Sequence, residues 1–153
     1  MSRSRLAAAT LSGLLALAGC GYGGEQPVAG PKMRSKSQAN ADVARYAEQT
    51  VTILRATTTG MVVTESACAE GLYSVQAVYR LPMGLTRHPR ARAVLRNTWQ
   101  ANKMPITLDT TVDGYRGAIS TVTPDGYTID VVTITSKPKA LSLQVRSPCL
   151  WAP

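Results

Sequence analysis

The chain contains no phenylalanine and only one histidine, His88. A Ser-His-Asp triad needs a histidine that an acidic side chain orients, but His88 lies among arginines and no acidic residue adjoins it in sequence. A structural zinc site is built from cysteine and histidine ligands, almost always four of them, and a lone histidine does not supply such a set. The sequence therefore predicts no bound metal or cofactor and no histidine-based catalysis.

Long hydrophobic runs are also scarce. Residues 6–17 form the longest one, with 12 residues, whereas a transmembrane helix needs about 20. A glycine-rich phosphate-binding loop is missing as well, because Gly114-Tyr115-Arg116-Gly117 is too short and lies in a predicted hairpin. We therefore expect no segment that spans a bilayer and no phosphate site of that type.

The N-terminus does contain the three-part pattern of a bacterial lipoprotein signal. Arg3 and Arg5 precede the apolar run, and Leu17-Ala18-Gly19-Cys20 follows at its end. This tetrapeptide matches a lipobox, the motif at which a precursor is lipidated on its cysteine and cut before it. The pattern predicts a signal peptide over residues 1–19 and an acylated Cys20. Two or three acyl chains such as palmitate would hold the protein firmly at the outer face of the cell membrane.

Two cysteines remain once Cys20 is acylated. Cys68 and Cys149 would then be the only thiols of an exported protein in oxidising surroundings. We expect a Cys68–Cys149 disulfide, with two separate buried thiols as the alternative. On the chain-entropy model, closing a loop of about 80 residues stabilises a fold by about 4–5 kcal/mol.

Basic residues outnumber acidic ones by 17 to 9. Removing Arg3 and Arg5 with the signal peptide lowers the formal net charge from +8 to +6, so the excess belongs to the exported part. A basic surface suits anionic partners. Outside a membrane we expect anionic lipid, a wall polymer or another envelope protein rather than nucleic acid.

The 134 residues after the predicted cleavage site are enough for one domain. Residues 20–39 are rich in Gly, Pro and Ser and show almost no apolar periodicity, which is typical of a flexible tether. Residues 40–153 are expected to form a single α+β domain.

Two helices and four to five strands are predicted within this domain. Apolar residues in 40–57 recur at steps of three and four, which predicts a helix with Asn40 as its N-cap. A second helix is predicted from Pro89, a residue favoured at the first helical position, to Asn102. Alternating patterns predict strands over residues 72–81, 106–112, 118–123, 127–133 and 141–145.

Residues 61–69 are ambiguous between a short strand and a loop leading to Cys68. Asp113-Gly114 and Asp125-Gly126 supply turns, because glycine readily adopts positive φ. We therefore expect an α+β fold: an antiparallel sheet of four to five strands with both helices packed on one face, in the order α-β-α-β-β-β(-β).

The second predicted helix carries the strongest local charge. An aromatic ring beside long basic side chains suits a layer of lipid headgroups. The candidate residues for binding an anionic surface are Arg87, Arg90, Arg92, Arg96, Trp99 and Lys103. The alternative is a solvated helix face that binds nothing.

Carboxylates leave a second class of function open. Glycoside hydrolysis uses a pair of acidic side chains, and the candidates on predicted strands and turns are Asp109, Asp113, Asp125 and Asp130. Asp113 and Asp125 each precede a glycine in a turn, so a structural role accounts for both of them.

Several features together resemble small lipoproteins of unknown function from high-GC Gram-positive bacteria. They are the lipobox, the basic helix ending in Trp99, the Asp125-Gly126-Tyr127 turn and the closing Ser147-Pro148-Cys149. The resemblance implies an acylated protein on the outer face of the cell membrane and carries no activity with it. Our interpretation is a membrane-anchored, non-enzymatic binding or accessory module of the cell envelope. The alternative is a small cell-wall hydrolase that uses paired carboxylates.

Overall fold

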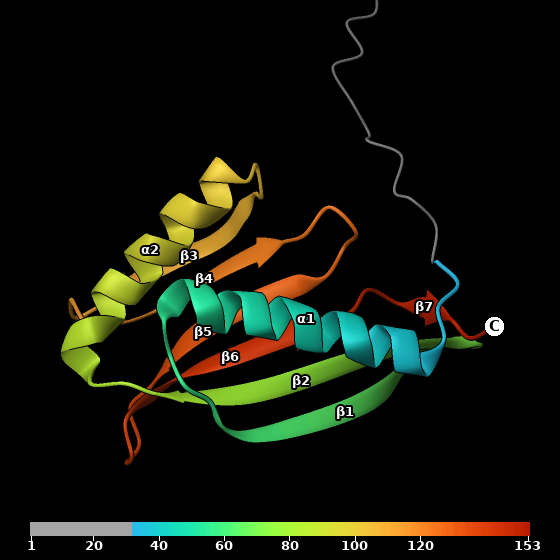
Figure 1. Ribbon diagram of the computed structural model, residues 1–153, viewed down its shortest axis with the longest axis horizontal. Helices are drawn as coiled ribbons and strands as arrows, with labels where there is room; N and C mark the ends of the chain where they lie inside the picture. Colours follow the sequence, from blue (N-terminus) through green and yellow to red (C-terminus); the bar gives the residue numbers. More distant parts are fainter. Residues whose placement is uncertain (1–31) are drawn as a thin grey trace, which may run out of the picture.

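The computed structural model describes residues 32–153. The predicted signal peptide, Cys20 and residues 20–31 of the predicted tether lie outside the described residues. The described part has two layers, a seven-stranded antiparallel sheet and two helices that pack on one of its faces (Figure 1). The predicted α+β class is confirmed. No helix within residues 32–153 has the length and apolar character needed to cross a membrane.

The sheet places strands from both halves of the chain side by side. Its strand order is β1-β2-β6-β5-β4-β3, and the short β7 pairs with the start of β2. The elements in chain order are α1 (Lys36–Leu54), β1 (Thr59–Ala69), β2 (Leu72–Pro82), the 3₁₀ turn η1 (Leu85–Arg87), α2 (His88–Ala101), β3 (Ile106–Val112), β4 (Arg116–Val122), β5 (Thr128–Ile134), β6 (Ala140–Arg146) and β7 (Leu150–Trp151).

The strand count and element order differ from the prediction. The chain adds β1 between α1 and β2, and β7 after β6, so the order is α-β-β-α-β-β-β-β-β rather than α-β-α-β-β-β(-β). Every residue of β1 is exposed, because β1 is an edge strand outside the cover of the helices. An edge strand of this kind has no alternation of buried and exposed side chains from which a sequence pattern could identify it.

Helix α1 begins four residues earlier than Asn40, the predicted N-cap. Ser35 is the N-cap, and its hydroxyl accepts a hydrogen bond from the Gln38 backbone N–H while the Gln38 side chain accepts one from the Ser35 N–H. This reciprocal pair is a capping box. Residues 36–39 therefore belong to the helix rather than to the tether. The segment before α1 is hydrogen-bonded to the C-terminal segment: the Arg34 N–H donates to the Trp151 carbonyl oxygen at 3.0 Å.

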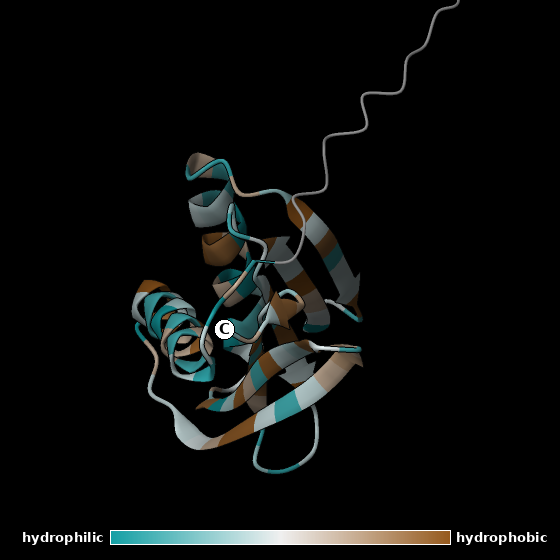
Figure 2. Ribbon diagram, turned by 90° about the vertical axis from the view of Figure 1, so that its right-hand side faces the viewer, coloured by the Kyte–Doolittle hydropathy of each residue, from teal (hydrophilic) through white to brown (hydrophobic). Residues whose placement is uncertain are grey.

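The hydrophobic core lies between the helices and the sheet. Hydrophobic and hydrophilic positions alternate along the strands, and the sheet bends around the helices (Figure 2). The largest fully buried apolar side chains come from six elements of both layers: Val43, Val75, Leu81, Leu95, Ile119, Val131, Leu141, Leu143 and Val145, joined by Leu150 in β7. This core fixes how α1 and α2 sit on the sheet.

The predicted turns and the predicted disulfide are present. Asp113 and Gly114 have φ values of 50° and 79° in the β3–β4 hairpin, and Gly126 has a φ of 93° in the β4–β5 turn. Cys68, near the end of β1, forms a disulfide with Cys149, which lies just before β7, with their Cα atoms 6.0 Å apart. The bridge ties the edge strand to the C-terminal segment.

Candidate functional site in the groove between the helices

The structure does not bring the six candidate residues of the basic helix together on one surface. The buried stripe of α2 consists of His88, Ala91, Arg92, Leu95 and Trp99, at the spacing expected for one helical face. Arg92 and Trp99 are each only 2% exposed, so neither is available to an external membrane or polymer. Lys103 lies after the end of α2 and is exposed. Its backbone φ is 58°.

Arg92 has a structural role instead. Its guanidinium donates to the Tyr115 carbonyl oxygen and to the Thr111 hydroxyl, both at 3.1 Å, and so joins α2 to the β3–β4 hairpin. A Cβ atom at Gly117 would collide with this guanidinium and with the Thr110 carbonyl oxygen. The lack of a side chain at Gly117 therefore allows the Arg92 guanidinium to lie against the backbone of the β3–β4 hairpin.

Arg96 is also engaged within the protein. Its guanidinium forms an ion pair with Asp109 on β3, and this hydrogen-bonded partner holds the pKa of Asp109 below its usual value. Of the six predicted residues, only Arg87 and Arg90 remain side by side and exposed at the start of α2.

His88 is a fully buried, hydrogen-bonded core residue. Its Nε2 lies 3.1 Å from the Met83 carbonyl oxygen, and its Nδ1 lies 3.3 Å from the Thr133 hydroxyl. Because the Met83 carbonyl oxygen can only accept, Nε2 carries the proton of the neutral ring, and the Thr133 hydroxyl donates to Nδ1 while it accepts from the Gly117 N–H at 3.2 Å. Burial lowers the pKa of His88, which suits this neutral form.

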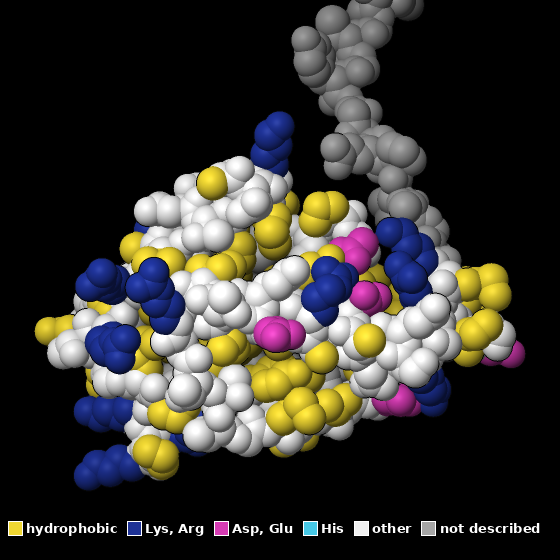
Figure 3. Space-filling model, in the orientation of Figure 1, with side chains coloured by type: hydrophobic (Ala, Val, Ile, Leu, Met, Phe, Trp, Pro, Cys, Tyr) yellow, Lys and Arg dark blue, Asp and Glu magenta, His cyan; other side chains and the backbone are white. Residues whose placement is uncertain are grey.

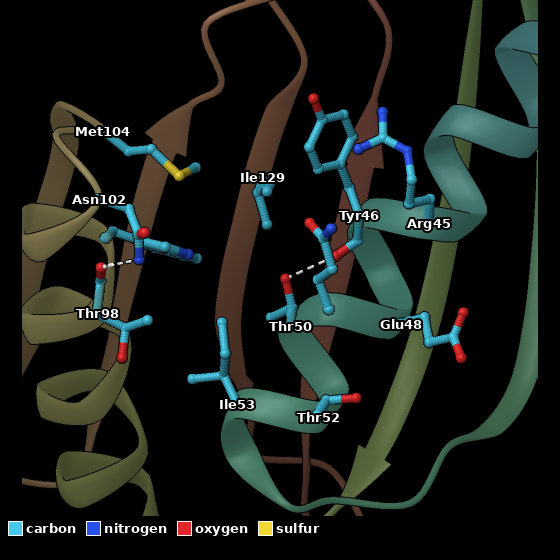
Figure 4. A pocket seen from close by; sticks show the side chains of 12 residues that line it. Arg45, Tyr46, Glu48, Thr50, Thr52, Ile53, Thr98, Asn102, Met104 and Ile129 are labelled. Carbon is cyan, nitrogen blue, oxygen red and sulfur yellow. Dashed lines mark hydrogen bonds between the residues drawn. The ribbon is translucent and has the colours of Figure 1, made fainter.

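A pocket of about 680 Å³ opens between α1 and α2 above β5 (Figure 4). Apolar side chains from both helices and the sheet line its interior, namely Ile53, Trp99, Met104 and Ile129. Polar and charged side chains of α1, including Arg45, Glu48 and Gln49, and Asn102 at the end of α2 complete the lining. The helices are far enough apart at this end to leave space that the core does not fill.

A hydrogen-bonded network closes the pocket at the side of Tyr46. The Tyr46 hydroxyl donates to Asp125 at 2.5 Å, and the Thr123 hydroxyl donates to the same carboxylate at 2.6 Å. Arg45 lies 3.0 Å from Asp42 and 4.0 Å from Asp125, and its guanidinium stacks over the Tyr46 ring at 4.2 Å. Asp125 therefore holds the middle of α1 against the β4–β5 turn, whereas the Asp42–Arg45 pair lies within α1.

A second pocket of about 690 Å³ lies at the other end of the two helices. Ile53 lines both pockets, so the two pockets adjoin along the helices, and together they are called the groove. Leu54, Met83, Ala91 and Val94 supply the apolar part of this second half. Its charged part consists of Arg55, Arg87 and Arg90. Sequence reasoning missed Arg55, because only the tertiary structure brings the end of α1 beside the start of α2.

The four predicted carboxylates do not converge on this groove. Asp109 pairs with Arg96, and Asp113 pairs with Arg116 in its own hairpin. Asp130 lies between the buried Ile129 and Val131 on β5 and therefore points to the opposite face of the sheet. None of the four lines either pocket.

The carboxylate in the lining of the first pocket is that of Glu48. Of the four predicted carboxylates, Asp125 is the one bonded to a lining residue, Tyr46. Although burial alone would raise the pKa of Asp125, the hydrogen bonds from Thr123 and Tyr46 hold it below its usual value. A general acid in glycoside hydrolysis needs the opposite shift. Within residues 32–153, no group of three or more His, Cys, Asp and Glu side chains is placed to hold a metal ion.

Comparison of the chain with protein-family models, with curated proteins and with solved structures finds no match.

Proposed function

We propose that the protein is a lipid-anchored module of the cell envelope that binds a partly apolar ligand in the groove between α1 and α2 and does not transform it. The observation that carries the proposal is the apolar interior of a large pocket on the helical face. Sites for small ligands are typically concave and mostly apolar, with a few polar groups at the rim. Figure 3 shows hydrophobic side chains in the hollow between the two helices.

Filling the pocket should abolish binding. Gln49 is an exposed residue of α1 that lines the pocket, so the side chain in Gln49→Trp would occupy the space without disturbing the core. We expect the purified mature domain to bind the neutral apolar fluorophore N-phenyl-1-naphthylamine saturably, and Gln49→Trp to weaken binding by about tenfold or more.

The matched control is Ala44→Trp, because Ala44 is an exposed residue of the same helix that does not line either pocket. It should bind the fluorophore as the unaltered protein does. Absence of saturable binding, or equal affinity in the two variants, would contradict the proposal for the groove.

The anchor is tested separately at Cys20. We expect Cys20→Ala to abolish incorporation of labelled palmitate and to leave either a released protein or an uncut precursor, because the lipobox cysteine carries the acyl chains. Fractionation of cells into membrane and soluble parts checks this. A processed protein that stays on the membrane without Cys20 would refute the anchor.

A further inference from the structure

The two ends of the groove differ in charge. At the end where α1 stops and α2 begins, three arginines line the second pocket: Arg55, Arg87 and Arg90. No ion pair among residues 32–153 involves any of the three. On the face drawn in Figure 3, Lys and Arg side chains gather at the left end of the molecule, and acidic side chains lie toward the centre and right. The charge at this end is therefore not balanced within the described part of the protein.

Arg55 occupies a backbone conformation that favours glycine. It is the C-cap of α1, with φ 48° and ψ 44° in the left-handed region. Glycine is the usual residue after the last turn of a helix in this conformation, and a branched or bulky side chain there costs energy. An arginine at this position places a cation at the mouth of the pocket where the fold alone would favour glycine.

Apolar side chains continue from the arginines toward the first pocket. Leu54, Met83 and Val94 lie in the lining with the arginines, and Ile53 belongs to both halves of the groove. Beyond Ile53 the lining contains Trp99 and Met104. A molecule that fills both pockets would therefore meet a cationic end and, beyond Ile53, apolar side chains among polar ones.

We propose that the groove takes a single-chain amphiphile with a phosphate headgroup. The phosphate lies at Arg55, Arg87 and Arg90, and the chain runs past Ile53 toward Trp99. The guanidinium group matches phosphate because its N–H donors form a planar fork that can bond two oxygens at once. This inference rests on the proposed binding function of the groove and adds the chemical class of the ligand.

Three probes separate the contributions of the head and the chain: decyl phosphate, 1-decanol and inorganic phosphate. We expect the mature domain to bind decyl phosphate about tenfold or more tightly than 1-decanol in isothermal titration calorimetry below micelle-forming concentrations, because each charge-assisted bond adds affinity. Inorganic phosphate alone should bind more weakly than decyl phosphate. Raising the salt concentration should reduce the preference for decyl phosphate, since exposed charges are screened.

The variant that tests the arginines is Arg55→Gly, Arg87→Ser, Arg90→Ser. Glycine at position 55 suits the left-handed cap, so this substitution removes the charge without straining α1. We expect the triple variant to bind decyl phosphate no more tightly than 1-decanol. The matched control, Lys103→Ser, Lys137→Ser, Lys139→Ser, removes the same charge from exposed residues outside the groove and should keep the preference.

The outcomes distinguish the two proposals. Binding of both amphiphiles with equal affinity in the unaltered protein, or an unchanged preference in the arginine variant, overturns the phosphate headgroup and leaves the groove as a binding site. Inorganic phosphate that binds as tightly as decyl phosphate overturns the role of the chain. Failure to bind either amphiphile, together with failure to bind the neutral fluorophore, overturns the proposed function itself. Thermal unfolding of each variant confirms that it is folded.

Discussion

Arg92 is a charged residue in the interior, and its side chain holds α2 to the β3–β4 hairpin. It is 2% exposed, and it bonds the Tyr115 carbonyl oxygen and the Thr111 hydroxyl. Both acceptors lose a charged donor if the guanidinium is removed. Hydrogen bonds to charged groups contribute more than neutral ones, and truncating a buried side chain also leaves a cavity.

We therefore expect Arg92→Ala to lower the free energy of unfolding by about 2–4 kcal/mol. Arg90→Ala serves as the control, because Arg90 is exposed on the same helix and exposed substitutions usually change stability by less than about 0.5 kcal/mol. Urea unfolding followed by circular dichroism measures both. Equal effects of the two substitutions would show that the burial of Arg92 does not matter to stability.

His88 should make the stability depend on pH near neutrality. Its pKa is lowered from 6.5 in the folded protein because burial disfavours the charged ring, so below pH 6.5 the unfolded chain binds a proton that the folded chain does not. The contribution of His88 to the free energy of unfolding is therefore fully present above pH 6.5 and decreases as the pH is lowered. The steepest slope is about 1.4 kcal/mol per pH unit.

Unfolding in urea between pH 7.5 and about pH 5 tests this dependence. Asp109, Asp113 and Asp125 have pKa values below 3.8, so their contributions are lost only at lower pH. In His88→Gln, which retains a donor and an acceptor, the slope in this range should disappear. A slope that persists in the variant would mean that another group titrates there.

At the scale of the element, the start of α1 depends on Ser35 rather than on Asn40. Ser35 and Gln38 satisfy each other's backbone N–H groups, whereas Asn40 lies inside the helix and donates to the Lys36 carbonyl oxygen. The sequence predicts a helix start at Asn40 because the apolar pattern begins only there, and a capping box adds no apolar residue to that pattern.

We expect Ser35→Ala to lower the free energy of unfolding by about 1 kcal/mol, the usual cost of losing an N-cap. Asn40→Ala should change it by less than about 0.5 kcal/mol, since alanine is the better helix former. The same urea experiment compares the two. A larger effect of Asn40→Ala would place the helix start where the sequence pattern predicts it.

At the scale of the whole molecule, the disulfide closes a loop that contains most of the sheet. Cys68 and Cys149 are 81 residues apart, and on the chain-entropy model such a loop stabilises the fold by about 4–5 kcal/mol. Cys68→Ser together with Cys149→Ser should lower the free energy of unfolding by about 2–5 kcal/mol, as is typical when native disulfides are removed.

Thiol titration of the denatured, non-reduced domain should find no free thiol, and reduction of the unaltered protein should destabilise it by a similar amount. Two free thiols in the unreduced domain would refute the bridge. The edge strand β1 is expected to be affected first, because its outer side is unpaired and the bridge lies near its end.

The groove is also a property of the whole molecule. Helix α1 begins beside β7, where the described chain starts, and ends beside the start of α2 at the opposite end of the molecule (Figure 1). The arginine end of the groove therefore lies away from residue 32, at which the described part of the chain begins.

The sequence by itself determined the features that depend on residues close together in the chain. The spacing of apolar side chains predicts five of the six long strands and both helices, since periodicity follows from local geometry. Asp113-Gly114 predicts a tight hairpin because positive φ is a local requirement. The Cys68–Cys149 pairing follows from the count of thiols once Cys20 is assigned to the lipid, although the anchor itself stays a prediction.

The tertiary structure decided what depends on residues far apart in the chain. The charge pattern of α2 cannot show that Arg92 and Trp99 face inward, because its buried stripe is set by the sheet and the β3–β4 hairpin. The sequence around β1 has no alternating pattern, since an exposed edge strand has no buried face. The groove exists only because the packing of both helices on the sheet leaves space between them, and this packing alone brings Arg55 beside Arg87 and Arg90.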